Sequence, residues 1–76
     1  MDYENIWAAQ VKPGDVIRGV GSSITVLVTY SNVEPDGRMC IVGLFNADGN
    51  DPLVQGLVTV APHNQHVMRL TEHVNH

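Results

Sequence analysis

The chain has 76 residues, a net charge of −4 and a single cysteine, Cys40. A chain this short forms one domain with a small core, because it buries only about 60–65% of the surface that its unfolded form exposes. One cysteine excludes an internal disulfide and a Cys-x-x-Cys metal clip. We therefore expect one domain over residues 1–76, stabilised by packing and hydrogen bonds alone.

The N-terminal sequence MDYENIWAAQ is acidic and lacks the basic and apolar runs of a secretory signal. No window approaches the ~20 consecutive apolar residues that a membrane-spanning helix requires. These features predict a cytoplasmic protein without a membrane segment. A compact acidic domain of this kind would suit an accessory protein of a bacterium or its phage.

The N-terminal segment, residues 1–12, is predicted to pack on the domain and holds the one helical candidate. Four side chains fall at the spacing of one helix face: Tyr3, Ile6, Trp7 and Gln10. Asp2 stands where a capping residue would, and Pro13-Gly14 would end the helix. A short extra strand over residues 6–11 is the alternative.

Turn signals divide the rest of the chain into five runs rich in Val, Ile, Leu and Thr, which are typical of strands. Strands are predicted near residues 15–20, 24–33, 38–45, 53–60 and 66–70. The run 24–33 alternates with a period of two, which places Ile24, Val26, Val28 and Tyr30 on one face and Thr25, Leu27, Thr29 and Ser31 on the other. Only Leu27 interrupts the polar face.

The tetrapeptide Glu34-Pro35-Asp36-Gly37 has proline where a type I turn needs a fixed φ and glycine where the chain needs a positive one. It is predicted to close a hairpin onto the strand near residues 38–45. Residues 71–76 follow the last strand and are expected to form a flexible tail.

Five short strands at this spacing favour a small closed barrel over an open sheet, because closure removes aggregation-prone edges. VKPGDVI (residues 11–17) resembles the entry strand of many small barrels. VTVAPHNQHVMRL (residues 58–70) is similar to the end of a Src-homology-three-like barrel, where a short turn with proline precedes the last strand. The resemblance implies an all-β, five-stranded barrel with a short N-terminal helix or extra strand. The resemblance concerns the fold alone, so function depends on a site.

The stretch LFNADGNDPLV gathers Asn46, Asp48, Asn50 and Asp51 around Gly49. An EF-hand loop needs glycine at its sixth position and glutamate at its twelfth. Counted from Asn46, glycine is fourth and the twelfth residue is a leucine. Asn, Asp and Gly also favour tight connections between strands. We interpret the stretch as a loop and not as a calcium site.

All four histidines lie near the C-terminus, as two H-x-x-H pairs: His63, His66, His73 and His76. A zinc site needs three or four ligands of this type. The pairs do not share a predicted helix, so we expect solvated side chains, with a weak adventitious metal site as the alternative. No cofactor is predicted.

Nothing in the sequence indicates catalysis. A nucleophilic cysteine needs a cationic neighbour or a helix start together with access to solvent, and Cys40 lies inside a predicted strand without either. Ser22 and Ser23 lack the Gly-x-Ser-x-Gly turn of a hydrolase and the lysine of a phosphate-binding loop. We expect the protein not to be an enzyme.

Two strands are apolar on both faces. RMCIVGLF carries Met39, Ile41 and Phe45 on one side and Cys40, Val42 and Leu44 on the other, and LVQGLVTV carries Val54, Val58 and Val60 against Leu53 and Leu57. A small barrel buries only its inward set, so the outward set requires a second cover. We predict a protein-binding or self-associating surface at Trp7, Leu27, Val42, Leu44 and Leu57.

The basic residues are few and scattered, at Lys12, Arg18, Arg38 and Arg69. Nucleic-acid binding needs clustered basic side chains that neutralise phosphates, so the sequence disfavours that class of partner. A nucleic-acid-associated barrel remains the alternative function. It would use the three arginines on phosphates and Tyr30 as a stacking platform.

Overall fold

The computed structural model describes residues 2–22, 24–46 and 54–71, and within them it is all-β. The strands are β1 (Tyr3–Trp7), β2 (Val16–Gly19), β3 (Thr25–Val33), β4 (Met39–Asn46), β5 (Val54–Val60) and β6 (His66–Leu70). The helical structure in these ranges is one 3-10 turn, η1 (Ala8–Gln10), so no described helix could cross a membrane. The prediction of an all-β fold is confirmed, with six described strands in place of five.

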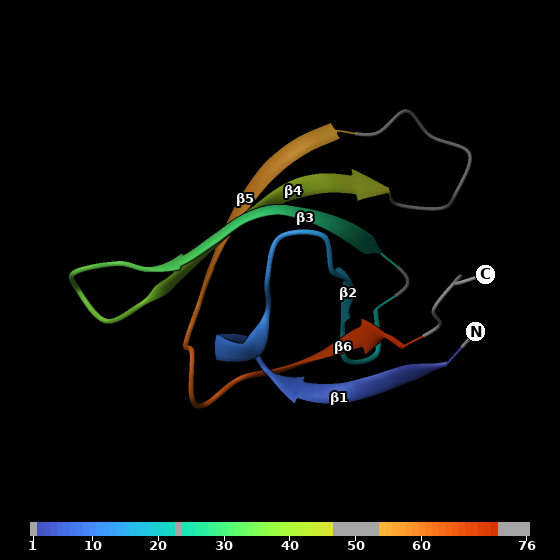
Figure 1. The fold of residues 1–76 in the computed structure, drawn as a ribbon, viewed down its shortest axis with the longest axis horizontal. Coiled ribbons are helices and arrows are strands. Elements are labelled where there is room, and N and C mark those ends of the chain that lie inside the picture. The colour runs from blue at the N-terminus through green and yellow to red at the C-terminus, as the bar shows by residue number, and fades with distance from the viewer. Residues whose placement is uncertain (1, 23, 47–53, 72–76) are drawn as a thin grey trace.

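The six strands form one antiparallel sheet in the order β1-β6-β2-β3-β4-β5. The sheet folds over on itself, so that β3, β4 and β5 lie above β1 and β6 in Figure 1. The prediction of a closed barrel is wrong. Among the described strands, β6 pairs with β1 on one side and β2 on the other, which leaves it no edge for β5. The sheet is therefore barrel-like but open, with β1 and β5 at its edges.

The N-terminal segment is a strand and not the predicted helix. Ile6 is buried and lies opposite Val67 of β6, so the backbone of β1 is paired along the sheet. The chain leaves the strand at Ala8, whose N–H donates to the carbonyl of Gln65 at 2.8 Å. Pairing with β6 outweighs the helical spacing of the side chains. The alternative of an extra strand is confirmed in kind, although it spans residues 3–7 instead of 6–11.

The hairpin between β3 and β4 has the predicted turn. Gly37 has φ of 88°, a conformation that glycine adopts without steric cost. Its N–H donates to the Glu34 carbonyl at 2.9 Å, and the Glu34 N–H donates to the Arg38 carbonyl at 2.7 Å. The Asp36 side chain accepts from the Arg38 N–H at 3.0 Å. The turn thus aligns β3 with β4 from Val33 opposite Met39 onward.

The core lies between the two halves of the folded sheet. Its buried side chains come from the N-terminal segment and from β2, β3, β4 and β6: Ile6, Ala8, Val11, Ile17, Val26, Val28, Met39, Ile41 and Val67. Phe45, Val58 and Val60 pack against this cluster. The inward direction is therefore confirmed for Met39, Ile41, Phe45, Val58 and Val60, whereas Val54 at the start of β5 is 62% exposed and Leu53 lies outside the described residues.

A β-bulge corrects the predicted faces of β3. Val26 and Val28 are buried as predicted, but the register shifts between Val28 and Tyr30. An extra residue in one strand reverses the side-chain alternation beyond it. Tyr30 consequently lies opposite the outward Val42 and is 45% exposed. Ser31 turns the other way, and its hydroxyl donates to the Val11 carbonyl at 2.9 Å.

Candidate functional site

The outward side of β3, β4 and β5 carries a group of apolar side chains, which we call the outer face: Leu27, Tyr30, Val42, Leu44 and Leu57. The pairing registers make them neighbours. Leu27 lies opposite Leu44, and Val42 lies between Tyr30 on one side and Leu57 on the other. Directly opposed side chains on one face of a sheet have Cβ atoms about 4.5–5.5 Å apart. The five residues therefore form one continuous surface.

The outer face is open to solvent at its margins. Leu57 is 62% exposed, Tyr30 45% and Leu27 41%, whereas Val42 and Leu44 at the centre are half-buried by their neighbours. Aliphatic and aromatic groups gathered on one side of a small domain, with no described element over them, are typical of an interaction surface. Four of the five residues predicted for the interface, all but Trp7, are brought together here.

Trp7 lies elsewhere in the fold, on β1 at the far edge of the sheet from β5. Its ring stacks on that of His66, which lies opposite it on β6, with centroids 3.8 Å apart. The indole is 43% exposed. The order of the strands places β6, β2 and β3 between β1 and β4, so Trp7 does not extend the outer face.

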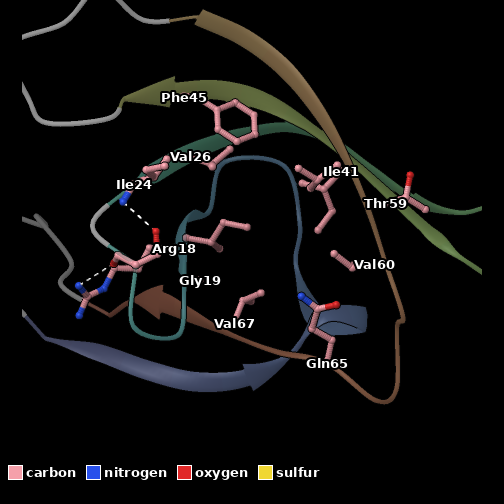
Figure 2. A pocket seen from close by; sticks show the side chains of 13 residues that line it. Arg18, Gly19, Ile24, Val26, Ile41, Phe45, Thr59, Val60, Gln65 and Val67 are labelled. Atoms are coloured by element: carbon pink, nitrogen blue, oxygen red, sulfur yellow. Dashed lines mark hydrogen bonds between the residues drawn. The ribbon is translucent and has the colours of Figure 1, made fainter.

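A second apolar feature lies inside the fold of the sheet (Figure 2). It is a cleft of about 380 Å³ between the two halves of the domain. Ile41 and Phe45 of β4 lie on one side with Val60 of β5, and Val67 of β6 faces them from the other, while Val58 also lines the cleft. Because β5 and β6 do not pair, the cleft is not closed by a strand between them. This cleft is the inner surface that a closed barrel would bury.

The arginines do not gather into a basic surface. Arg18 and Arg69 are on neighbouring strands but lie opposite Met68 and Ile17 respectively, so their side chains leave opposite faces of the sheet. Arg18 packs its guanidinium 4.5 Å over the centre of the Tyr3 ring. Its Nη1 donates to the Ser22 carbonyl at 3.2 Å.

The charge of Arg69 is neutralised within the domain. Its guanidinium donates to Glu4 Oε2 from Nε at 2.9 Å and from Nη2 at 2.7 Å, and Nη1 lies 3.7 Å from Asp15 Oδ2. The hydrogen bond to Glu4 raises the pKa of Arg69 above its ordinary value, and the negative charges of Glu4 and Asp15 add to this effect. This arginine is committed to joining β1 and β6.

The remaining arginine, Arg38, belongs to the hairpin turn between β3 and β4, which extends away from the rest of the domain in Figure 1. Tyr30 is on the outer face, on the strand that leads into this hairpin. The three arginines and the tyrosine proposed for nucleic-acid contacts are therefore not brought to one surface.

The described residues do not form a metal centre. His66 stacks on Trp7, and His63 is exposed in the turn before β6. No group of three or more His, Cys, Asp or Glu side chains within residues 2–22, 24–46 and 54–71 is placed to hold a metal ion. The other two histidines and the Asp and Gly residues of the loop between β4 and β5 lie outside these ranges.

Cys40 is half-buried on β4, opposite Asn32 on one side and Thr59 on the other. Strands lie on both sides of β4, so Cys40 does not stand at the start of a helix. Thr71 does not belong to a free tail, because its N–H donates to the Asp2 carbonyl at 2.9 Å. Residues 72–76 lie outside the described ranges.

Sequence reasoning missed two features of this site. One is Tyr30, since an irregular bulge reverses its direction and period-two reasoning assumes a regular strand. The other is the position of β5 at an open edge, which follows from the pairing of β6 with β1. The composition of β5 could have indicated it, because an uncharged strand that is apolar on both faces is a template for pairing with a further strand.

No protein-family model matches the chain, and comparisons with curated proteins and with solved structures also find no match.

Proposed function

We propose that this domain is a non-catalytic protein-interaction module that binds a protein surface, either a second copy of itself or another chain, through the outer face. The observation that carries the proposal is the register that sets Leu27 beside Leu44 and Val42 beside Leu57. Side chains far apart in the sequence form one apolar surface, and its margins are exposed. Covering such a surface is favourable by about 25 cal/mol per Å² of apolar area removed from water.

Binding of nucleic acid is less well supported. Such binding depends on several cationic groups facing the same phosphates. Here Arg69 is paired with Glu4, and Arg18 leaves the opposite face of the sheet. The net charge of −4 also opposes approach to a polyanion. A protein partner is therefore the better match.

We also propose that β2 to β6 correspond to a Src-homology-three-like barrel. The support is that these five strands occur in the order β6-β2-β3-β4-β5 and that a short turn at residues 61–65 precedes β6. In this interpretation β1 is an addition to the barrel. The proposal concerns architecture and carries no implication for a peptide ligand, because function depends on the site and not on the fold.

The substitution Leu44→Lys tests the proposed function. Leu44 is half-buried on the outer face and its side chain does not enter the core. We expect the variant to remain folded by circular dichroism while its association, measured by sedimentation over a concentration series, is lost. Lysine at the centre of a buried apolar contact would leave an unpaired charge, which costs several kcal/mol.

Val20→Lys is the matched control. Val20 is an aliphatic residue that is 65% exposed in the turn after β2, away from the outer face. It should leave both folding and association unchanged, since surface changes usually alter stability by no more than about 0.5 kcal/mol. A folded Leu44→Lys protein that associates as the unmodified chain does would overturn the proposed function. An unfolded one would place Leu44 in the core instead.

A further inference from the structure

The backbone of β5 presents unpaired hydrogen-bonding groups at the edge of the sheet, and their positions follow from the bonds of Val28. The Val28 N–H donates to the Asp15 carbonyl at 2.9 Å, and its carbonyl accepts from the Gly14 N–H at 2.8 Å. Both groups therefore point away from β4. Successive residues of an antiparallel strand direct these groups to alternate sides. Gly43, opposite Val28, consequently directs its own groups toward β5.

The same alternation assigns the groups of β5. Gly56 lies opposite Gly43 and bonds to it, as does Val58 to Ile41. Gln55, Leu57 and Thr59 then direct their N–H and C=O groups to the outside, where no described strand pairs with them. The Thr29 hydroxyl donates to the Val42 carbonyl at 3.2 Å, which places that carbonyl on the β3 side and agrees with this assignment. We call these outward groups the free edge.

The free edge lacks the features that normally prevent strand addition. Edge strands usually carry lysine, proline or a bulge, or are very short. β5 is seven residues long, has the sequence VQGLVTV and keeps a regular register with β4 throughout. Val54 and Leu57 are each 62% exposed. A strand of this kind is suited to accept another extended strand.

We propose that β5 pairs antiparallel with β5 of a second copy of this chain, about a two-fold axis at Leu57. This inference goes beyond the proposed function, because it places a separate contact at the edge of the sheet, which shares only Leu57 with the outer face. Residues directly opposite each other in a sheet must lie on the same face. When two identical strands pair antiparallel about a two-fold axis, this condition is met if one residue lies opposite its own copy. Leu57 is the middle residue of β5 and one of the three that form the free edge.

The two free edges are complementary in this register. Leu57 lies opposite Leu57 of the partner subunit, and Gln55 lies opposite Thr59 of the partner subunit. Each of the three outward residues supplies one N–H donor and one C=O acceptor, so every pair can exchange both bonds. On the inner side, Val60 lies opposite Val54 of the partner subunit. Apolar groups meet apolar groups, and amide meets hydroxyl.

A second copy can pair with β5 because this strand is uncharged, although the chain as a whole is acidic. The chain carries a net charge of −4, so two copies repel each other at long range. β5 itself contains no Asp, Glu, Lys or Arg. The proposed contact therefore brings no like charges together within the pairing strands. The added strand would also lie next to Val58 and Val60, which line the cleft, and would extend the sheet at that side.

The first experiment places charges at Gln55 and Thr59 in two combinations. Gln55→Lys with Thr59→Lys sets lysine opposite lysine at both ends of the pairing, whereas Gln55→Glu with Thr59→Lys sets glutamate opposite lysine. Both positions are exposed, so both variants should fold. By sedimentation equilibrium, we expect the first to dimerise about ten-fold more weakly than the second. The difference should shrink in 1 M salt.

The second experiment tests the register by oxidation in a Cys40→Ala background. Leu57→Cys should form a disulfide-linked dimer, because directly opposed residues of a hydrogen-bonded pair have Cα atoms about 5.5 Å apart, within disulfide range. Thr59→Cys is the matched control. Two copies of that position are offset by four residues along the strands, roughly 13 Å, and should not be linked.

The outcomes separate this inference from the proposed function. A mass of 8.3 kDa up to about 1 mM protein, equal association of the two charge variants, or equal cross-linking at positions 57 and 59 would each overturn pairing of β5. Leu44→Lys dissociation without any difference between the charge variants would show binding through the outer face alone. The expected result is selective cross-linking at position 57, together with dimerisation that is about ten-fold weaker with lysine opposite lysine than with glutamate opposite lysine.

Discussion

Trp7 and His66 lie opposite each other on β1 and β6, and their rings stack with an angle of 25° between the planes. The contact joins β1 and β6, which are the first and last described strands in chain order. The stack is on the outward side, because the neighbouring Ile6 and Val67 point into the core. Trp7, which the sequence suggested as an interface residue, is thus already in contact within the domain.

Trp7→Ala should therefore weaken folding and spare association. Loss of the stacked pair should lower the free energy of unfolding by about 1–2 kcal/mol, which includes the stacking itself and the partial burial of the indole. The measurement is urea unfolding followed by circular dichroism, because Trp7 is the only tryptophan and its fluorescence disappears with it. Trp7→Phe keeps a ring over His66 and should retain most of the stability. If the Trp7→Ala variant folds but no longer associates, Trp7 is part of the interface after all.

Gly43→Ala should be strongly destabilising. A Cβ atom at Gly43 would lie 2.5 Å from the Leu27 carbonyl oxygen and 2.6 Å from Val26 Cγ1, so β3 and β4 would have to move apart. We expect overpacking of this kind to lower the free energy of unfolding by about 1–3 kcal/mol. Gly19→Ala is the control, since its Cβ would meet only Ser22 Cβ at an ordinary 3.6 Å. Thermal melts that show equal losses for both variants would contradict the close approach at Gly43.

Proline scanning of β5 checks which of its backbone groups are free. Val58→Pro removes an N–H that bonds to Ile41 of β4 and should lower the free energy of unfolding by about 3 kcal/mol or more. Thr59→Pro removes an N–H of the free edge and should cost the isolated domain less than about 1 kcal/mol. Urea unfolding at low micromolar protein separates the two. A larger loss for Thr59→Pro would reverse the assignment of bond directions in β5.

Gly37→Val should destabilise the hairpin between β3 and β4. The φ of 88° is accessible to glycine but strained for a β-branched residue, so we expect a cost of about 1 kcal/mol or more. Gly37→Asn should be tolerated better, because asparagine adopts positive φ more readily. No described atom lies within 4 Å of a Cβ at this position, so crowding does not complicate the comparison. Identical melting temperatures for the two variants would show that the positive φ at residue 37 does not affect the stability of the hairpin.

Local pattern in the sequence was sufficient for much of the strand content. The five predicted runs correspond to β2 through β6, and the turn at Glu34 to Gly37 was identified because proline and glycine impose their own φ values. The inward residues of β4 were also correct, since a regular strand alternates with a period of two. These features depend on neighbours in the chain, which the sequence displays directly.

Tertiary contacts decided the rest. β1 is a strand because β6 offers it a paired edge, and helical spacing cannot reveal that edge. The same pairing leaves β5 unpaired and the sheet open, while the bulge in β3 turns Tyr30 outward. The sequence by itself determined that β4 and β5 carry aliphatic side chains on both faces. Only the register between strands decided that Leu27 and Leu44 meet and that Trp7 does not join them, because backbone pairing is set by hydrogen bonds between residues distant in the chain.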